Sequence, residues 1–211
     1  VHKAMDSTGA VIGPLLVVPV LLAAATVTTD TYRSIFLLAT IPAALAVGVL
    51  FLFVKEPERK APRATGRMWK DVNRLGGGFW ALIAVVLIFF AGEISYSFFV
   101  LQSQAQGMGT IATILLYTLF NAVFVLVSLP SGIYSDRVGR RPILSLSFVL
   151  FAVTCLVMAS ADGLPLLIAG FMLYGVYKGM SEGAFKAFVV DMVPQDLRGT
   201  ALGVYHTAVG L

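Results

Sequence analysis

The chain has 211 residues, of which 58% are hydrophobic and only 12% are charged, with a formal net charge of +4. Soluble domains carry about 25% charged residues, and a soluble globule could not hide this much apolar surface. The composition therefore excludes a soluble domain, a disordered chain, a disulfide scaffold and a nucleic-acid module. It predicts an integral membrane protein.

Six apolar stretches are each long enough to cross a bilayer as a helix, which takes about 20 residues. In chain order they cover residues 9–27, 35–54, 79–101, 111–130, 143–161 and 164–190. A seventh apolar stretch starts near Thr200 and reaches Leu211, which is too short to span. None of these stretches alternates apolar and polar residues as barrel strands do. The sequence therefore predicts an all-α membrane protein, a polytopic bundle of transmembrane helices.

The basic residues lie almost entirely on one side of the predicted helices. Twelve of the 15 Lys and Arg residues fall in the loops on the side of Lys3, and only Arg33 falls in a loop on the other side. Short loops rich in Lys and Arg face the cytoplasm. We therefore expect a multi-pass protein of a bacterial inner (cytoplasmic) membrane, with Lys3 inside.

One connection between the predicted helices is far longer than the others. Residues 55–78 are polar and basic, and they end in the run Gly76-Gly77-Gly78. A linker of this kind indicates a domain boundary, and its charge suits contact with anionic lipid headgroups. We expect residues 1–54 to end an N-terminal bundle with two transmembrane helices, residues 55–78 to be a cytoplasmic linker, and residues 79–211 to form a C-terminal bundle with four transmembrane helices and the start of a fifth.

The most specific motif follows the fourth apolar stretch. It combines two glycines, one acid and three arginines, namely Gly132, Asp136, Arg137, Gly139, Arg140 and Arg141. The glycines allow a sharp reversal, the arginines can anchor to the cytoplasmic surface, and Asp136 can pair with an arginine or lie at a helix N-terminus. The motif resembles the signature loop G-x-x-x-D-R-x-G-R-R/K of the major facilitator superfamily.

The resemblance implies a fold and a position within it. In this superfamily the loop follows helices two and eight, and the linker lying one helix pair upstream implies the second copy. The chain starts at Val1 and ends within an apolar run, so we expect a fragment that runs from helix five into helix eleven of twelve. The resemblance also implies two bundles joined by a cytoplasmic linker and working by alternating access.

Two further segments carry weaker resemblances. Gly9, Gly13 and Pro14 are similar to the helix-five motif of antiporters in the superfamily, although Val17-Val18-Pro19 follows where a further pair of glycines is usual. The same residues are equally explained as a packing face with a kink at the proline. Residues 191–200 resemble the loop between helices ten and eleven.

Four charged residues lie inside the predicted spans: Glu93, Lys178, Glu182 and Lys186. A charge at the bilayer centre costs about 2.5–3.5 kcal/mol on insertion scales, so such residues are functional candidates. The helical rise places Glu93 about 21 Å and Lys178 about 18 Å from the cytoplasmic ends of their stretches, so the two can meet. The resemblance implies that these stretches are helices seven and ten, which line the central cavity in the superfamily, so we expect both Glu93 and Lys178 to face the substrate path. Glu93 is the candidate proton-coupling group. Glu182 can instead be a counter-ion to its lysine neighbours, and Lys186 can snorkel to the interface.

A stripe of small residues runs about 100° around the same helix from the lysines and predicts close packing against another helix. It consists of Gly175, Gly179 and Gly183. Asn121 and His206 are isolated polar residues, which more often bond to a neighbouring helix than take part in chemistry.

Several chemistries have no motif in this sequence. It has no phosphate-cradling loop, no metal-binding spacing and no recognisable set of nucleophile, base and acid, so we predict no enzyme, no cofactor, no metal, no ATP and no nucleic acid. The expected partners are a small-molecule substrate, protons and the lipid bilayer. The glycine motif near the N-terminus favours proton-coupled export, as in a drug:proton antiporter. The alternative is proton-coupled uptake of a sugar or organic anion by symport, and Lys178 would suit an anionic substrate rather than a purely cationic drug. A membrane scaffold would not need Glu93 or Lys178, and a membrane-embedded enzyme would need a reactive constellation.

Overall fold

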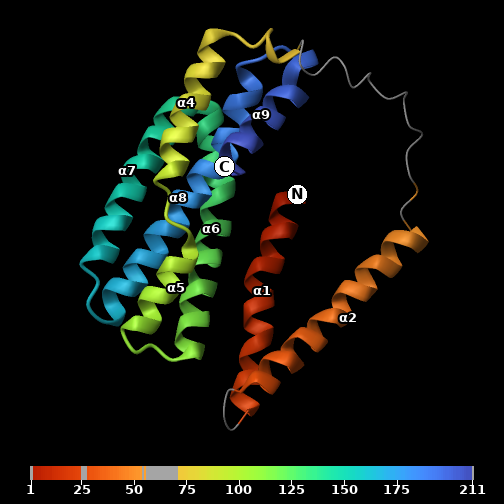
Figure 1. The fold of residues 1–211 in the computed structure, drawn as a ribbon, viewed down its shortest axis with the longest axis vertical. Coiled ribbons are helices and arrows are strands. Elements are labelled where there is room, and N and C mark those ends of the chain that lie inside the picture. The colour runs from red at the N-terminus through yellow and green to blue at the C-terminus, as the bar shows by residue number, and fades with distance from the viewer. Residues whose placement is uncertain (1, 25–27, 54, 56–70, 211) are drawn as a thin grey trace.

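The computed structural model describes residues 2–24, 28–53, 55 and 71–210, with side chains described from Gly9 onward. Within these ranges the chain forms helices and no strand (Figure 1). The helices are α1 (His2–Ala23), α2 (Thr29–Phe53), α4 (Gly77–Ala91), α5 (Tyr96–Ala105), α6 (Thr110–Val138), α7 (Arg140–Ala159), α8 (Leu164–Asp191), the 3-10 helix η2 (Gln195–Leu197) and α9 (Arg198–Gly210). Five segments of the described chain are long and apolar enough to cross a membrane, with α4 and α5 together making one. The expected all-α, multi-pass membrane architecture is confirmed.

Helix α8 is the centre of the bundle. It makes its most extensive contacts with α6 and α7, and α9 also packs on it. Among the five candidate spans it has the lowest hydropathy and the largest buried share. These two properties belong together, because a helix that its neighbours shield from lipid can carry charged and polar side chains at lower cost.

The contact between α6 and α8 depends on two glycines of the predicted stripe. A Cβ atom added at Gly175 would lie 2.8 Å from the backbone oxygen of Phe120 and 2.9 Å from Cβ of Val123. A Cβ atom at Gly179 would lie 3.0 Å from the backbone oxygen of Phe124. At Gly175 the two backbones therefore approach more closely than a residue with a side chain can accept without a shift, and at Gly179 the approach is almost as close.

The predicted third span, residues 79–101, is not one continuous helix. Helix α4 ends at Ala91 and α5 begins at Tyr96. The backbone N–H of Ser97 donates to Oγ of Ser95, which caps the N-terminus of α5. Ile94 O accepts a hydrogen bond of 3.3 Å from the Tyr174 hydroxyl. The break thus has local causes, since glycine at position 92 weakens a helix and serine favours a cap, and its backbone is partly satisfied from α8.

The signature segment is mostly helix and not an extended loop. Helix α6 continues to Val138 and α7 starts at Arg140, so only Gly139 separates them. Gly139 has φ +102°, a conformation that side chains disfavour, so it makes the reversal alone. Gly132 lies within α6 and makes no turn, and in this respect the expectation that both glycines form the reversal is wrong.

The two N-terminal helices lie differently from the rest. Helix α1 runs alongside α6, whereas α2 extends away from the bundle (Figure 1). None of the residues of α2 is buried. Residues 25–27 of the first predicted span and residues 56–70 of the predicted linker lie outside the described residues. The proposed division into domains remains a prediction.

Candidate functional site

Three of the four charged residues predicted within the spans line one cavity of about 450 Å³. The cavity is bounded by the α4–α5 region, α6, α8 and α9. Its volume lies in the range of about 300–1,000 Å³ that is usual for small-molecule sites. The lining residues are Phe90, Tyr96, Phe120, Asn121, Phe124, Lys178, Ser181, Glu182, Phe185, Lys186, Tyr205, His206 and Val209.

The fourth predicted residue, Glu93, was expected to face the same path but is not among the lining residues and lies behind this wall. It follows the end of α4, and its Oε1 atom forms an ion pair with Nζ of Lys178. The Glu93 side chain is only 9% exposed, whereas the Lys178 side chain is 28% exposed and lines the cavity. A molecule in the cavity therefore meets the ammonium group first, and the carboxylate is covered by it.

Two tyrosines of α8 complete the surroundings of the ammonium group. Nζ of Lys178 lies 5.9 Å from the ring centroid of Tyr174 and 5.6 Å from that of Tyr177. Contacts of this kind attract a cation by about 0.5–2 kcal/mol, more where water is excluded. Both rings are almost fully buried. The cation is thus held by one carboxylate and two aromatic faces, while part of it stays open to the cavity.

Glu182 and Lys186 form a separate ion pair on the cavity wall. The pair spans one helical turn, with Nζ 3.2 Å from Oε1, and the side chains are 40% and 44% exposed. The structure therefore divides the four charges into two pairs, one buried and one half-open.

The two isolated polar residues, Asn121 and His206, also reach the cavity. Nδ2 of Asn121 donates to the backbone oxygen of Tyr117, so its bond stays within its own helix and does not cross to another. The His206 ring packs edge-on against Tyr205 with 5.2 Å between centroids. In the part of the chain that the structure describes, no group of His, Cys, Asp and Glu gathers that could hold a metal ion.

Arg140 is the hub of the signature segment. It forms ion pairs with Asp136 at 2.5 Å and with Asp191 at 3.1 Å, and it donates a hydrogen bond to Oγ of Ser135. These contacts tie the α6–α7 turn to the end of α8. Arg137 is exposed and, like Arg141, has no ion pair among the described residues.

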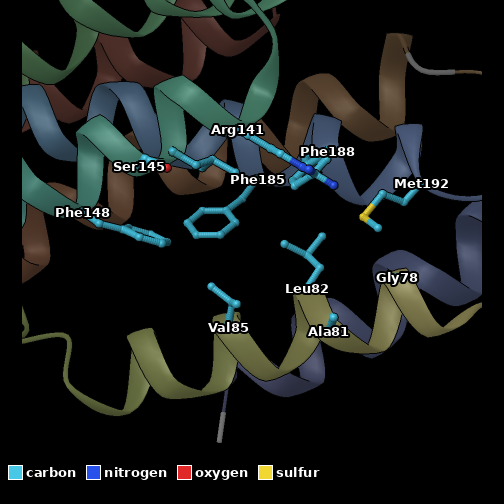
Figure 2. Close-up of a pocket in the computed structure, with 11 residues that line it drawn as sticks. Gly78, Ala81, Leu82, Val85, Arg141, Ser145, Phe148, Phe185, Phe188 and Met192 are labelled. Carbon is cyan, nitrogen blue, oxygen red and sulfur yellow. The ribbon is translucent and has the colours of Figure 1, made fainter.

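Arg141 lines a second pocket of about 290 Å³. Figure 2 shows residues of α4 on one side of this pocket and residues of α7 and α8 on the other, with Arg141 reaching toward Phe188 and Met192. The remaining walls are mostly apolar, so this pocket offers one cation and little else.

The residues of the antiporter-like motif lie on α1. A Cβ atom at Gly9 or Gly13 would meet nothing within 4 Å among the described residues. Pro14 lines a third cavity, of about 440 Å³, together with Tyr32 of α2 and residues of α5 and α6. The motif is therefore placed where the N-terminal helices meet the rest of the chain.

Sequence reasoning missed several residues of the site. Tyr174 and Tyr177 flank Lys178, but aromatic residues are so common in apolar stretches that they gave no signal. Asp191 was noticed only as part of a turn, and its pairing with Arg140 links positions 51 residues apart. Arg74, from the end of the linker, pairs with Asp196 before α9 at 3.1 Å.

Comparison with known proteins identifies the family to which the chain belongs. The family model of the Major Facilitator Superfamily matches residues 2–211. The chain belongs to the major facilitator superfamily. An uncharacterized MFS-type transporter of Methanocaldococcus jannaschii is 29% identical over 217 residues, which cover 100% of this chain and 53% of the relative. An uncharacterized protein of Mycobacterium bovis is 28% identical over 226 residues, 100% of this chain and 52% of the relative. The chain thus spans about half the length of these relatives.

A shorter match involves a sugar transporter. The arabinose-proton symporter of Bacillus subtilis is 32% identical over 76 residues, which cover 36% of this chain and 16% of the symporter. No solved structure matches the chain. Two of these relatives, the MFS-type protein and the symporter, are named as transporters.

Proposed function

We propose that the full-length protein is a proton-coupled transporter in which Glu93 carries the coupling proton. The observation that supports this proposal is the buried Glu93–Lys178 ion pair beside a cavity of small-molecule size. In the same proposal residues 1–54 end the N-terminal bundle, residues 55–78 form a cytoplasmic linker and residues 79–211 belong to the C-terminal bundle. The membrane is the cytoplasmic membrane of a bacterium.

The ion pair is suited to coupling because neither of its members is stable alone in a low-dielectric site. Removing one partner of a buried pair leaves an uncompensated charge, which costs about 3–5 kcal/mol. When Lys178 turns to a ligand in the cavity, Glu93 avoids this cost by taking up a proton. Loading and protonation then favour each other, and the loaded site can close and open to the other side of the membrane.

This linkage favours symport, in which substrate and proton move in the same direction. Lys178 faces the cavity and Glu93 does not, so a substrate engages the cation and leaves the carboxylate free for the proton. One of the relatives is named as an arabinose-proton symporter. Because of that similarity, a sugar is one candidate substrate.

Export in exchange for protons is the second candidate. Gly9, Gly13 and Pro14 favour it through their similarity to an antiporter motif, and Pro14 lies at the cavity between the N-terminal helices and α5 and α6. In an antiporter the substrate would have to displace the proton. That requires contact with the Glu93 carboxylate, which Lys178 covers in the described conformation.

The test uses the full-length protein in liposomes that contain a pH-sensitive dye. Glucose, arabinose, 4-toluenesulfonate and ethidium are added outside in turn, and the internal pH is followed. A substrate that acidifies the interior indicates symport, and one that makes it alkaline indicates antiport. We expect Glu93→Gln to abolish the pH change, whereas Asp30→Asn, which alters an exposed pair with Arg33, should leave it intact. A pH change that survives in Glu93→Gln would contradict the role of Glu93.

A further inference from the structure

The chemistry of the cavity wall narrows the class of substrate. Among the described residues the wall carries two lysines and one glutamate, so this part of the surface that a ligand meets has a formal charge of +1. Glu93 lies behind the wall and brings the total to zero. If Glu93 takes up a proton, the site carries a net positive charge that the apolar surroundings penalise.

Only certain ligands restore neutrality after that protonation. One monovalent anion bound at Lys178 returns the total charge to zero, whereas a neutral sugar leaves +1 and a cation makes it +2. The empty site with ionised Glu93 and the site loaded with one anion and one proton are therefore the two neutral states. A transporter that alternates between them moves no uncompensated charge within its cavity.

The uncharged part of the wall favours an apolar body on that anion. Six aromatic residues line the cavity: Phe90, Tyr96, Phe120, Phe124, Phe185 and Tyr205. The uncharged polar groups are Asn121, Ser181, His206 and the hydroxyls of Tyr96 and Tyr205, and two of these residues are already partly engaged, since Asn121 donates to the backbone oxygen of Tyr117 and Ser181 to that of Lys178. These groups could hydrogen-bond a sugar, so the charge balance and not a lack of polar groups distinguishes an anion from a neutral sugar.

We propose that the cavity binds a monovalent organic anion with an apolar or aromatic body, whose acidic group engages Lys178 while Glu93 takes up one proton. This inference rests on the proposed proton-coupled function and names its substrate class. The acidic group can be a carboxylate or a sulfonate, since both carry one negative charge that can pair with Lys178. The aromatic wall holds the body of the molecule, and the proton and the anion enter and leave together.

Other titratable and charged groups surround the pair and must be separated from it. They are Tyr174, Tyr177, Glu182 and Lys186 on α8, Tyr96 on α5, Tyr117 on α6, Cys155 on α7, and Tyr205 and His206 on α9. Imidazole is the side chain whose charge ordinarily changes between pH 5 and 8, so His206 is the main competitor for any pH dependence near neutrality.

The test is calorimetric binding of 1-naphthalenesulfonate to the purified full-length protein at pH 6 and pH 8. The sulfonate stays ionised throughout, so any pH dependence belongs to the protein. We expect at least tenfold tighter binding at pH 6, with uptake of up to one proton measured in two buffers of different ionisation enthalpy. The neutral 1-naphthylmethanol and the cationic 1-naphthylmethylammonium should bind at least tenfold more weakly at pH 6.

Two variants assign the effect to residues. Glu93→Gln should bind the sulfonate at pH 8 at least as tightly as the unmodified protein does at pH 6, without proton uptake. Glu182→Gln also frees a lysine on the wall but keeps Glu93, so the pH dependence should persist. A pH dependence that persists in Glu93→Gln would belong to another group and would overturn the proposal.

Removing Lys178 needs a variant that can fold. Lys178→Met alone leaves Glu93 buried without a counter-ion, so the double variant Glu93→Gln, Lys178→Met is used, in which the pair is neutral. It should lose at least tenfold in sulfonate affinity relative to Glu93→Gln. If the double variant and Glu93→Gln bind the sulfonate with equal affinity, Lys178 does not bind the anion and the proposal is wrong.

The proposal and the proposed function can fail separately. Sugar-driven acidification of liposomes that depends on Glu93, without sulfonate binding, would keep proton coupling and remove the anion. Sulfonate binding with proton uptake, but without any transport, would keep the anion site and remove the transport function.

Discussion

The close approach of α6 and α8 at Gly175 gives a stability prediction whose sign differs from that of an ordinary glycine replacement. In Gly175→Ala the new Cβ would lie 2.8 Å from the backbone oxygen of Phe120, where ordinary contacts begin at 3.4 Å. The two helices must therefore separate locally by about 0.6 Å, and both sides of the contact are backbone or branched side chain. Overpacking of this kind costs about 1–3 kcal/mol, and the better helix propensity of alanine returns about 1 kcal/mol.

The expected net loss for Gly175→Ala is thus up to about 2 kcal/mol, and Gly175→Val should lose more because it adds two further methyl groups. The control is Gly203→Ala in α9, where a Cβ meets nothing within 4 Å among the described residues, so only the propensity gain remains. Thermal unfolding of the full-length protein in detergent measures the order: Gly203→Ala at or above the unmodified protein, then Gly175→Ala, then Gly175→Val. If Gly175→Ala stabilises as much as Gly203→Ala, the backbones are not in contact there.

Two other contacts give predictions of similar size. The Gln106 side chain donates to the backbone oxygen of Ala161 at 2.7 Å and accepts from the backbone N–H of Gly163 at 2.9 Å. Gln106→Ala should therefore lower the free energy of unfolding by about 1–3 kcal/mol. An unchanged unfolding midpoint would show that these bonds do not tie α5 to the α7–α8 turn. Arg140→Gln removes both ion pairs of a hub whose carboxylate partners are half-exposed, so we expect a loss of about 0.5–2 kcal/mol at low salt that shrinks in 1 M salt. A loss that is independent of salt would indicate a packing role for Arg140.

The helices could be predicted because a membrane span requires a long, continuous run of apolar residues, which is visible in the sequence. The break between α4 and α5 was not, since glycine and serine are common within membrane helices and the apolar run continues on both sides of Glu93. The extent of α6 was also missed, because its last turn is charged and looks like a loop. In both cases the helix boundary depends on single residues, the Ser95 cap at the start of α5 and the positive φ of Gly139 after α6, which the apolar pattern does not contain.

The candidate site was predictable in part for a similar reason. Helical rise alone placed Glu93 and Lys178 at similar depth, and the structure brings them into contact. We expected both side chains to face the substrate path, whereas Lys178 lines the cavity and Glu93 does not, because the direction of the Glu93 side chain depends on the backbone at the break. Helical rise also could not find Tyr174 and Tyr177, whose importance comes from the position of the ammonium group over their rings.

The break and the ion pair are held by the same turn of α8. Tyr174 donates its hydroxyl to the backbone oxygen of Ile94 within the break, and its ring lies under the ammonium group of Lys178 one turn later. Glu93 precedes Ile94 and pairs with that same ammonium group. A change in the charge of Glu93 therefore acts on the residue that fixes the junction of α4 and α5 as well as on the cation that faces the cavity. In a continuous helix the backbone oxygen of Ile94 would be bonded within its own helix, and it would not be available to accept from the Tyr174 hydroxyl of α8.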